Sequence, residues 1–192
     1  ISLNGEPTLY TRLSEYMDLC HKHGMTTMLV TNGTLPKVLE KLDTLPTQLY
    51  VSVDAPNKKV FDEVCKPKWN TNAWDKFSET LDLLPSLDTR IVCRHTLMQG
   101  INMSDQHIKE FAALDMRADP DFIENKGYFF VGHSRENLGV ENMPSHEEIM
   151  DFSNKIAPLT GRKYLSDSRP SRLALVAPEI VPLLVPQATM YI

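Results

Sequence analysis

The sequence predicts an α/β protein built around a mainly parallel β-sheet. Short apolar segments typical of buried strands alternate with amphipathic segments that repeat at helical spacing along the 192 residues. This βαβα order favours parallel strands joined by crossover helices. Hydrophobic residues make up 42% of the sequence and charged residues 23%, a balance typical of a folded globular chain. Because no linker or low-complexity tract interrupts the pattern, we expect a single core domain.

In the first half of the chain, apolar side chains three or four residues apart predict the first helix. They are Leu9, Leu13, Met17 and Cys20. Pro7 suits the first turn of this helix and Gly24 suits its C-terminal end. Strands are expected at residues 1–3, 25–30 and 48–53, and helices at about residues 36–42, 58–64 and 74–84. Asn72 is a candidate N-cap for the last of these helices.

The second half of the chain continues the alternation. Strands are expected at residues 90–97, 121–126 and 172–176, and helices at about residues 105–112 and 146–157. Ser145 and Glu148 have the spacing of a capping box. A complete eightfold barrel has more strands and about 250 residues. A partial barrel and an open doubly wound sheet both fit the observed pattern.

Residues 177–192 form an apolar tail after the expected core of residues 1–176. Pro178, Pro182 and Pro186 interrupt this tail, and Glu179 adds a charge. Because proline breaks helices, we do not expect the tail to span a membrane.

Composition narrows the classes of function. A formal net charge of -5 argues against a module that coats nucleic acid, because such binding depends on neutralising phosphates, although it permits a local basic patch. Cys20, Cys65 and Cys93 match no disulfide framework or metal-binding spacing, so we expect no metal site within this sequence. Three free thiols fit a reducing cytoplasm.

Polar residues gather where the predicted strands end, which is where the chemistry of both candidate architectures is located. The groups are Gly5-Glu6-Pro7, Thr31-Asn32-Gly33, Ser52 with Asp54, Arg94 with Thr96, and Glu124 with Lys126. Each group also has a purely structural explanation, as a helix start, a turn, a helix cap or an ion pair. Their recurrence at successive strand ends predicts a site for a polar ligand that carries carboxylate and amino groups.

The strand at residues 48–53 shows which side chains face that site. Alternate residues point to opposite faces of a strand. The apolar set is Leu49, Val51 and Val53, and the polar set is Tyr50, Ser52 and Asp54. We expect the apolar set to pack under helices and the polar set to face inward. Glu124 and Lys126 also share one face, where a charge is costly unless it is paired or used.

Several segments, taken in order, resemble one family of enzymes. They are Ser2–Tyr10, Gln48–Pro56, Pro120–Glu124, Lys126-Gly127, Glu141–Pro144, His146–Glu148 and Pro170–Arg172. The set is similar to radical S-adenosylmethionine (SAM) enzymes, and most closely to the archaeal-type tRNA 4-demethylwyosine synthases of wybutosine biosynthesis. A Gly-Glu-Pro motif alone is weakly specific, but the ordered set covers residues 1–176.

The resemblance implies a partial (β/α)6 barrel, a 4Fe–4S cluster held by three cysteines, and SAM bound through its amino and carboxylate groups to that cluster. The implied reaction joins N1-methylguanosine in tRNA-Phe to two carbons of pyruvate and gives 4-demethylwyosine, a carbon–carbon lyase chemistry. An external electron donor and a monomeric, cytoplasmic enzyme without a membrane anchor are implied as well.

The resemblance also implies roles for the residues at the strand ends. The SAM-binding residues would be Gly5, Glu6, Pro7, Thr31, Asn32, Ser52, Asp54 and Arg94. Glu6 would accept from the SAM amino group, and Arg94 would pair with its carboxylate. Lys126 would be the catalytic residue that holds pyruvate as a Schiff base, because a lysine among apolar neighbours can lose its proton near neutral pH. In the following loop, His133 and Arg135 would either meet tRNA or be solvated.

The sequence departs from the family's pattern in one main respect. The cluster motif C-x3-C-x2-C does not occur, and the resemblance begins at the family's second strand. We therefore expect that the first strand–helix unit, with the cluster cysteines, lies upstream and that this fragment alone is inactive. Asn125 stands where relatives carry an aliphatic residue, and Gln99 stands where a basic residue is expected.

Two other functions fit the residues. The chain could belong to another radical SAM enzyme, such as a glycyl-radical activase, but the segments after Asp121 argue against this. It could also be a SAM- or tRNA-binding module with neither cluster nor catalysis. Iron content and SAM cleavage would separate the last alternative from an enzyme.

Overall fold

A computed structural model describes residues 1–2, 5–67 and 72–179, and the structural statements below concern those ranges. The strands are β1 (Met28–Thr31), β2 (Gln48–Val53), β3 (Arg90–Leu97), β4 (Phe122–Gly127), β5 (Lys163–Ser168) and β6 (Leu173–Ala177). The α-helices are α1 (Leu13–Lys22), α2 (Pro36–Glu40), α3 (Lys58–Val64), α4 (Ala73–Leu83), α5 (Asp105–Ala118) and α6 (His146–Leu159). Short 3₁₀ segments are η1 (Pro7–Leu9), η2 (Leu84–Ser86), η3 (Gly132–Glu136) and η4 (Val140–Asn142).

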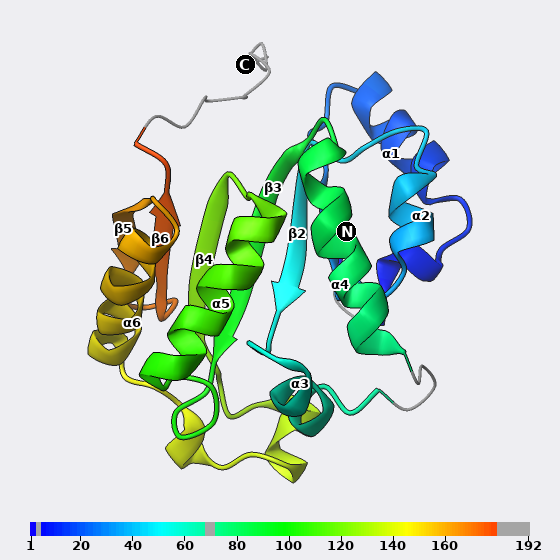
Figure 1. Cartoon of the computed structure of the whole chain (residues 1–192). Coiled ribbons are helices and arrows are strands. Elements are labelled where there is room, and N and C mark those ends of the chain that lie inside the picture. The colour runs from blue at the N-terminus through cyan, green and yellow to red at the C-terminus, as the bar shows by residue number, and fades with distance from the viewer. Residues whose placement is uncertain (3–4, 68–71, 180–192) are drawn as a thin grey trace.

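The six described strands form one sheet with the order β1-β2-β3-β4-β6-β5 (Figure 1). Strands β1 to β4 are parallel neighbours, which confirms the predicted α/β class with a mainly parallel sheet. Strand β6 runs antiparallel to β4 and to β5. The carboxyl ends of β1 to β4 therefore lie at one edge of the sheet, where the polar groups were predicted to meet.

Three element predictions need correction. The first helix is divided, because η1 ends at Leu9 and α1 begins only at Leu13. Strand β5 was not predicted, because its side chains are mostly exposed and polar and show no apolar alternation. Asn72 occupies the N-cap position of α4, but its side chain makes no capping hydrogen bond.

The start of the chain adds a backbone contact to β1. The amino nitrogen of Ile1 donates to the Met28 carbonyl at 2.5 Å, and the Val30 nitrogen donates to the Ile1 carbonyl at 3.2 Å. These two bonds have the pattern of a parallel pair. Residue 3 of the strand predicted at residues 1–3 lies outside the described ranges, as do residues 180–192 of the predicted tail.

The two faces of the sheet differ as the alternation of β2 predicts. Leu49, Val51 and Val53 are fully buried, whereas Tyr50 and Ser52 on the other face are half-buried. Figure 1 shows α4 and α5 lying across one face of the strands. The central aromatic side chains of the core come from three helices: Phe77 of α4, Phe111 of α5 and Phe152 of α6. Within the described residues, no helix is long and apolar enough to cross a membrane.

A fully buried polar network on the helix side of the sheet explains Asn125. The Asn125 Oδ1 lies 2.8 Å from His95 Nδ1, and Asn125 Nδ2 donates to Ser153 Oγ at 2.9 Å. His95 Nε2 lies 3.1 Å from Asp115 Oδ1, and its ring stacks on Phe111 with centroids 4.4 Å apart. Buried polar groups are tolerated when they are hydrogen-bonded. An aliphatic residue at position 125 would leave His95 and Ser153 without these partners.

We predict that Asn125→Ala lowers the free energy of unfolding by about 2 kcal/mol, because it removes the buried hydrogen bonds to His95 and Ser153 and leaves His95 Nδ1 without a partner. Urea denaturation measures this loss. Asn154→Ala, at an exposed position of α6, is the matched control and should change stability by no more than about 0.5 kcal/mol. Equal effects of the two substitutions would show that the network is not a significant source of stability.

Candidate functional site

The carboxylate of Glu6 joins the Gly5-Glu6-Pro7 segment to the end of β1. Its Oε1 accepts from the Thr8 and Thr31 hydroxyls, both at 2.7 Å, and its Oε2 accepts from the Asn32 backbone nitrogen at 2.8 Å. Thr31 is buried, and Asn32 begins the turn that follows β1. From the sequence, Glu6 was predicted only to accept from a ligand amino group. The structure gives the carboxylate a scaffold role in addition, with more acceptor capacity left on Oε2 than on Oε1.

Gly33 shows why this turn needs glycine. Its φ is +70°, and an added Cβ would lie 3.2 Å from side-chain atoms of both Phe77 and Val51. The Gly33 carbonyl also accepts from the buried Thr80 hydroxyl at 2.6 Å. The turn predicted for Thr31-Asn32-Gly33 is therefore real, and it is held against α4 while Asn32 faces the site.

A cavity of about 770 Å³ lies at the ends of these strands. Four of the predicted residues line it, namely Glu6, Asn32, Ser52 and Asp54. The remaining predicted residues, Gly5, Pro7, Thr31, Arg94 and Lys126, are not among its lining residues. Much of its wall is apolar, with Leu9, Leu35, Phe61, Val64, Met98 and Leu138 contributing side chains. An apolar wall with a few polar groups at one end suits an amphipathic small molecule.

Several residues that line this cavity were not predicted from the sequence. Tyr128 and Ser134 enter it from the loop after β4, and their hydroxyls are 3.1 Å apart. Lys76 enters from α4 and Cys65 from the end of α3. A strand-end rule selects residues that directly follow strands, so residues from helices and from the middle of a loop escape it.

Asp54 has an unusual environment for a carboxyl group. Burial raises its pKa above the ordinary value of 3.8, and this effect is opposed by a hydrogen bond with Thr96 and by the charges of His95 and Arg94. Thr96 lies on β3 and also lines the cavity. The side chains of Asp54 and Thr96 therefore lie next to each other at the ends of β2 and β3.

Arg94 lies on the inward face but is already paired. Its Nε donates to Glu124 Oε1 at 2.7 Å, and its guanidinium lies 4.5 Å from the centre of the Tyr50 ring. The Tyr50 hydroxyl is 3.5 Å from Glu124 Oε2. Glu124 is thus the partner of Arg94 and not of Lys126, which corrects the ion pair considered from the sequence. The Arg94 guanidinium has further N–H groups that could donate to a ligand. Contact between Arg94 and a ligand therefore stays a prediction.

Lys126 lies on the same inward face of β4, half-buried, two residues after Glu124. Its Cα partner across the ladder is Thr96, which lines the cavity, and on the other side it is Leu173. Across the part of the chain that the structure describes, no hydrogen bond or ion pair engages its ammonium group. The structure therefore places an unengaged lysine one strand away from the Asp54–Thr96 pair.

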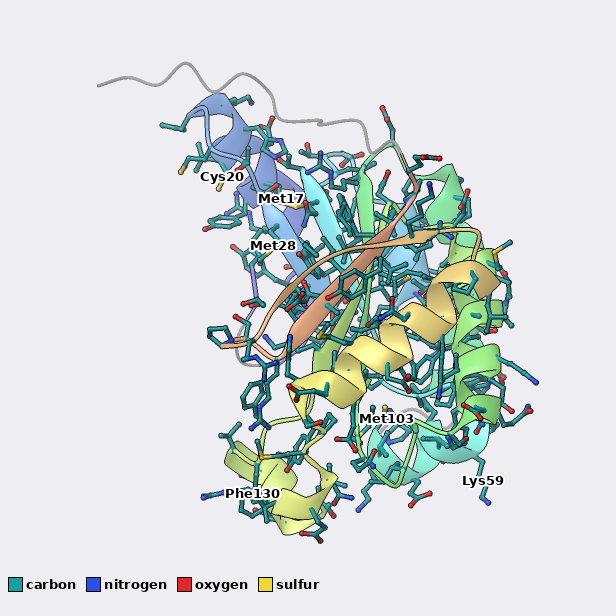
Figure 2. All side chains as sticks on the ribbon, turned by 90° about the vertical axis from the view of Figure 1, so that its left-hand side faces the viewer. Met17, Cys20, Met28, Lys59, Met103 and Phe130 are labelled. Carbon is teal, nitrogen blue, oxygen red and sulfur yellow. The ribbon has the colours of Figure 1, made fainter. Side chains whose placement is uncertain are left out.

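The loop after β4 presents the side chains considered for tRNA. The His133 side chain is completely exposed, and Arg135 lies over Phe130 with 5.8 Å between its guanidinium and the ring centre. Figure 2 shows Phe130 on this loop at the lower end of the molecule. The exposure of His133 is compatible with both roles considered, contact with RNA and simple solvation.

No group of three or more His, Cys, Asp or Glu side chains that could hold a metal ion occurs among the described residues. Cys93 is buried in β3, Cys20 is on α1, and Cys65 follows α3. The cysteines of this chain are therefore not arranged to bind an iron–sulfur cluster.

Comparison with known proteins divides the chain into two matched parts. Residues 1–112 match the family model of the radical SAM superfamily, and residues 117–178 match the model for wyosine base formation. The SAM-dependent tRNA 4-demethylwyosine synthase of Pyrococcus horikoshii is 41% identical over 180 residues, which is 92% of this chain and 52% of the relative. The enzyme of the same name from Methanocaldococcus jannaschii is 40% identical over 93% of this chain and 55% of the relative. The chain thus spans about half the length of these relatives.

Solved structures agree with these matches. A structure of TYW1 with a lysine–pyruvate adduct bound has a TM-score of 0.84 and 38% identity, and the alignment covers 95% of this chain and 58% of that chain. A domain of a pyruvate-formate lyase-activating enzyme from Bacteroides vulgatus has a TM-score of 0.63 but only 16% identity over 82% of this chain and 91% of that chain. The second likeness shows a shared fold alone.

We predict that Asp54→Asn stabilises the protein increasingly as the pH rises. The raised pKa means that the folded protein holds the Asp54 proton more tightly than the unfolded chain does. In the native sequence this stabilising contribution is complete below the ordinary pKa of 3.8 and is lost as the pH rises through the folded-state pKa. Urea unfolding of both proteins between about pH 4 and about pH 8 measures the difference. Parallel stability profiles would contradict the assigned environment.

Proposed function

The chain belongs to the radical SAM superfamily, and we propose that it serves the synthesis of 4-demethylwyosine in tRNA, with SAM bound in the cavity at the ends of β1 to β3. The observation that carries this proposal is the order of the two matched parts: a radical SAM part is followed directly by a wyosine part within one chain. The strand ends that line the cavity belong to the first part, and Lys126 with its loop belongs to the second.

Membership of the superfamily implies SAM and a 4Fe–4S cluster as cofactors. The residues present fit SAM, because the cavity combines apolar walls with carboxyl, hydroxyl and amide groups at the strand ends. Glu6 and the main chain of Gly5 and Pro7 would hold the amino group, and Thr31 and Asn32 would flank it. Ser52 and Asp54 would contact the methionine or ribose part, with the SAM carboxylate near Arg94. SAM and the cluster would supply radical chemistry when bound.

The residues described do not provide ligands for the cluster. The contribution of this chain is to bind SAM, exclude water around it and present a second substrate. The apolar wall formed by residues such as Leu35, Phe61 and Met98 would exclude water from the reacting groups.

For the second substrate we propose pyruvate, held on Lys126. The neutral amine would attack the ketone carbon of pyruvate, and loss of water would leave a Schiff base. Three observations support Lys126: its ammonium is unengaged among the described groups, it faces inward, and it pairs in register with Thr96 of the cavity wall. The related TYW1 structure with a lysine–pyruvate adduct shows that a protein of this shape accommodates such an adduct. Lys76 is the alternative lysine, because it lines the cavity directly.

The remaining substrate would be tRNA-Phe carrying N1-methylguanosine, and an external donor would supply the electron. The loop after β4 would meet the RNA, because it contributes Tyr128 and Ser134 to the cavity while exposing His133 and Phe130 to solvent. A single-stranded RNA base can stack on an exposed aromatic ring. We propose that one chain acts as a monomer in the cytoplasm.

We predict that borohydride reduction in the presence of pyruvate leaves a stable carboxyethyl group on Lys126. Reduction converts the carbon–nitrogen double bond of the Schiff base into a secondary amine, which survives proteolysis. Peptide mass spectrometry of the treated protein identifies the modified lysine. Lys126→Arg should abolish this adduct, because arginine keeps the positive charge but does not form a Schiff base.

Lys76→Arg is the matched control and should leave the adduct in place. A carboxyethyl group on Lys76, or on any other lysine, would transfer the role away from Lys126. A complete lack of adduct in a protein that forms 4-demethylwyosine from pyruvate would rule out the Schiff base.

A further inference from the structure

Asn102 is a completely buried asparagine in the turn between β3 and α5, and its whole side-chain amide is engaged. Its Oδ1 accepts from the Met98 backbone nitrogen at 2.7 Å. Its Nδ2 donates to two carbonyls, those of Thr96 at 2.8 Å and Asp54 at 3.1 Å. The partners fix the orientation of the amide, because a backbone N–H requires the oxygen and two carbonyls require the nitrogen.

The position of this amide follows from how the parallel ladder ends. Val53 and His95 are the last residues paired between β2 and β3. Among the described residues the ladder between β2 and β3 ends at this pair, so the carbonyls of Asp54 and Thr96 lie just beyond it. Buried backbone carbonyls need donors. The two hydrogens of Asn102 Nδ2 meet this need for both strands with one group, so the amide links the two strand ends.

The linked residues are the ones that form the cavity. Asp54, Thr96 and Met98 all line it, whereas Asn102 itself does not. Interaction with the Thr96 side chain also lowers the pKa of the Asp54 carboxyl group, so the two side chains are neighbours. The spacing between the Asp54 carboxyl and the Thr96 hydroxyl therefore depends on the amide behind them.

We propose that Asn102 is a positioning residue for the SAM site: its buried amide sets the gap between the ends of β2 and β3, so that SAM affinity depends on a residue that does not touch SAM. This inference rests on the proposed binding of SAM in the cavity. Positioning of this kind matters because binding groups must be held within a fraction of an ångström of their working geometry.

Asn102→Asp is the sharpest test, because it keeps the shape of the side chain and changes its donors. The carboxylate form would still accept from Met98, but its second oxygen would face two carbonyls. The protonated form would donate to one of them again. Burial and the facing carbonyls would raise the pKa of this new carboxyl group. The variant should therefore bind SAM about tenfold more weakly than the native protein at about pH 7.5 and recover most of that loss at about pH 5.5.

The measurement is the dissociation constant of SAM by calorimetry, with a thermal unfolding scan of each protein in the same buffers. Affinities are compared with the native protein at each pH, which cancels the pH effects that both proteins share; the neighbouring titratable groups are Asp54 and His95. Asn102→Ala should bind weakly at both pH values. Asn154→Asp, at an exposed position, should bind like the native protein at both.

The outcomes separate the inference from the proposed function. If the enzyme with its cluster in place and native Asn102 binds no SAM, the proposed function fails and the positioning role fails with it. If the native protein binds SAM and folded Asn102 variants bind equally well, only the positioning role is overturned. An equal loss for Asn102→Asp at both pH values would also overturn it, because the restored donor would then have no effect. If Asn102→Ala does not fold, the positioning role is tested by the SAM affinity of Asn102→Asp at the lower pH alone.

Discussion

The parallel register of β1 to β4 is the constraint on which the rest of the structure depends. Parallel strands that share a register end at one edge, and their ladder of hydrogen bonds stops there. The backbone and side chains beyond that edge need new partners. The Glu6 carboxylate supplies them at the end of β1, and the Thr96 hydroxyl meets the Asp54 carboxyl at the ends of β2 and β3. The cavity at this edge is therefore lined by groups that the scaffold already holds in place.

The helix-covered face of the sheet carries packed core residues, and the inward face carries the polar residues of the candidate site. On the helix side, β3 and β4 are joined by the buried pair of His95 and Asn125, with apolar side chains around it. On the inward side, the same strands carry Arg94, Glu124 and Lys126. Neighbouring residues of a strand point to opposite faces. Each inward polar residue of β3 and β4 is therefore next in the chain to a residue that packs on the helix side, and this packing holds its backbone in place. Placing a carboxyl group at this site lowers stability, because burial disfavours the charged form of Asp54.

The period of two residues along β2 was enough to predict which residues face the site. Ser52 and Asp54 line the cavity, and Leu49, Val51 and Val53 pack on the helix side as expected. Cross-strand partners were not predictable, because the spacing of Glu124 and Lys126 within one strand does not reveal that Arg94 lies opposite Glu124. Strand β5 was missed for a different reason: an exposed polar edge strand has no apolar pattern to detect.

We propose that SAM binds at the carboxyl ends of β1, β2 and β3. Hydrogen–deuterium exchange of the protein with and without SAM tests this directly. We expect slower exchange with SAM in three separate segments, residues 5–9, 31–35 and 52–54, and in residues 96–98 behind them. No protection in any of these segments at saturating SAM, or protection confined to another region of the chain, would contradict it.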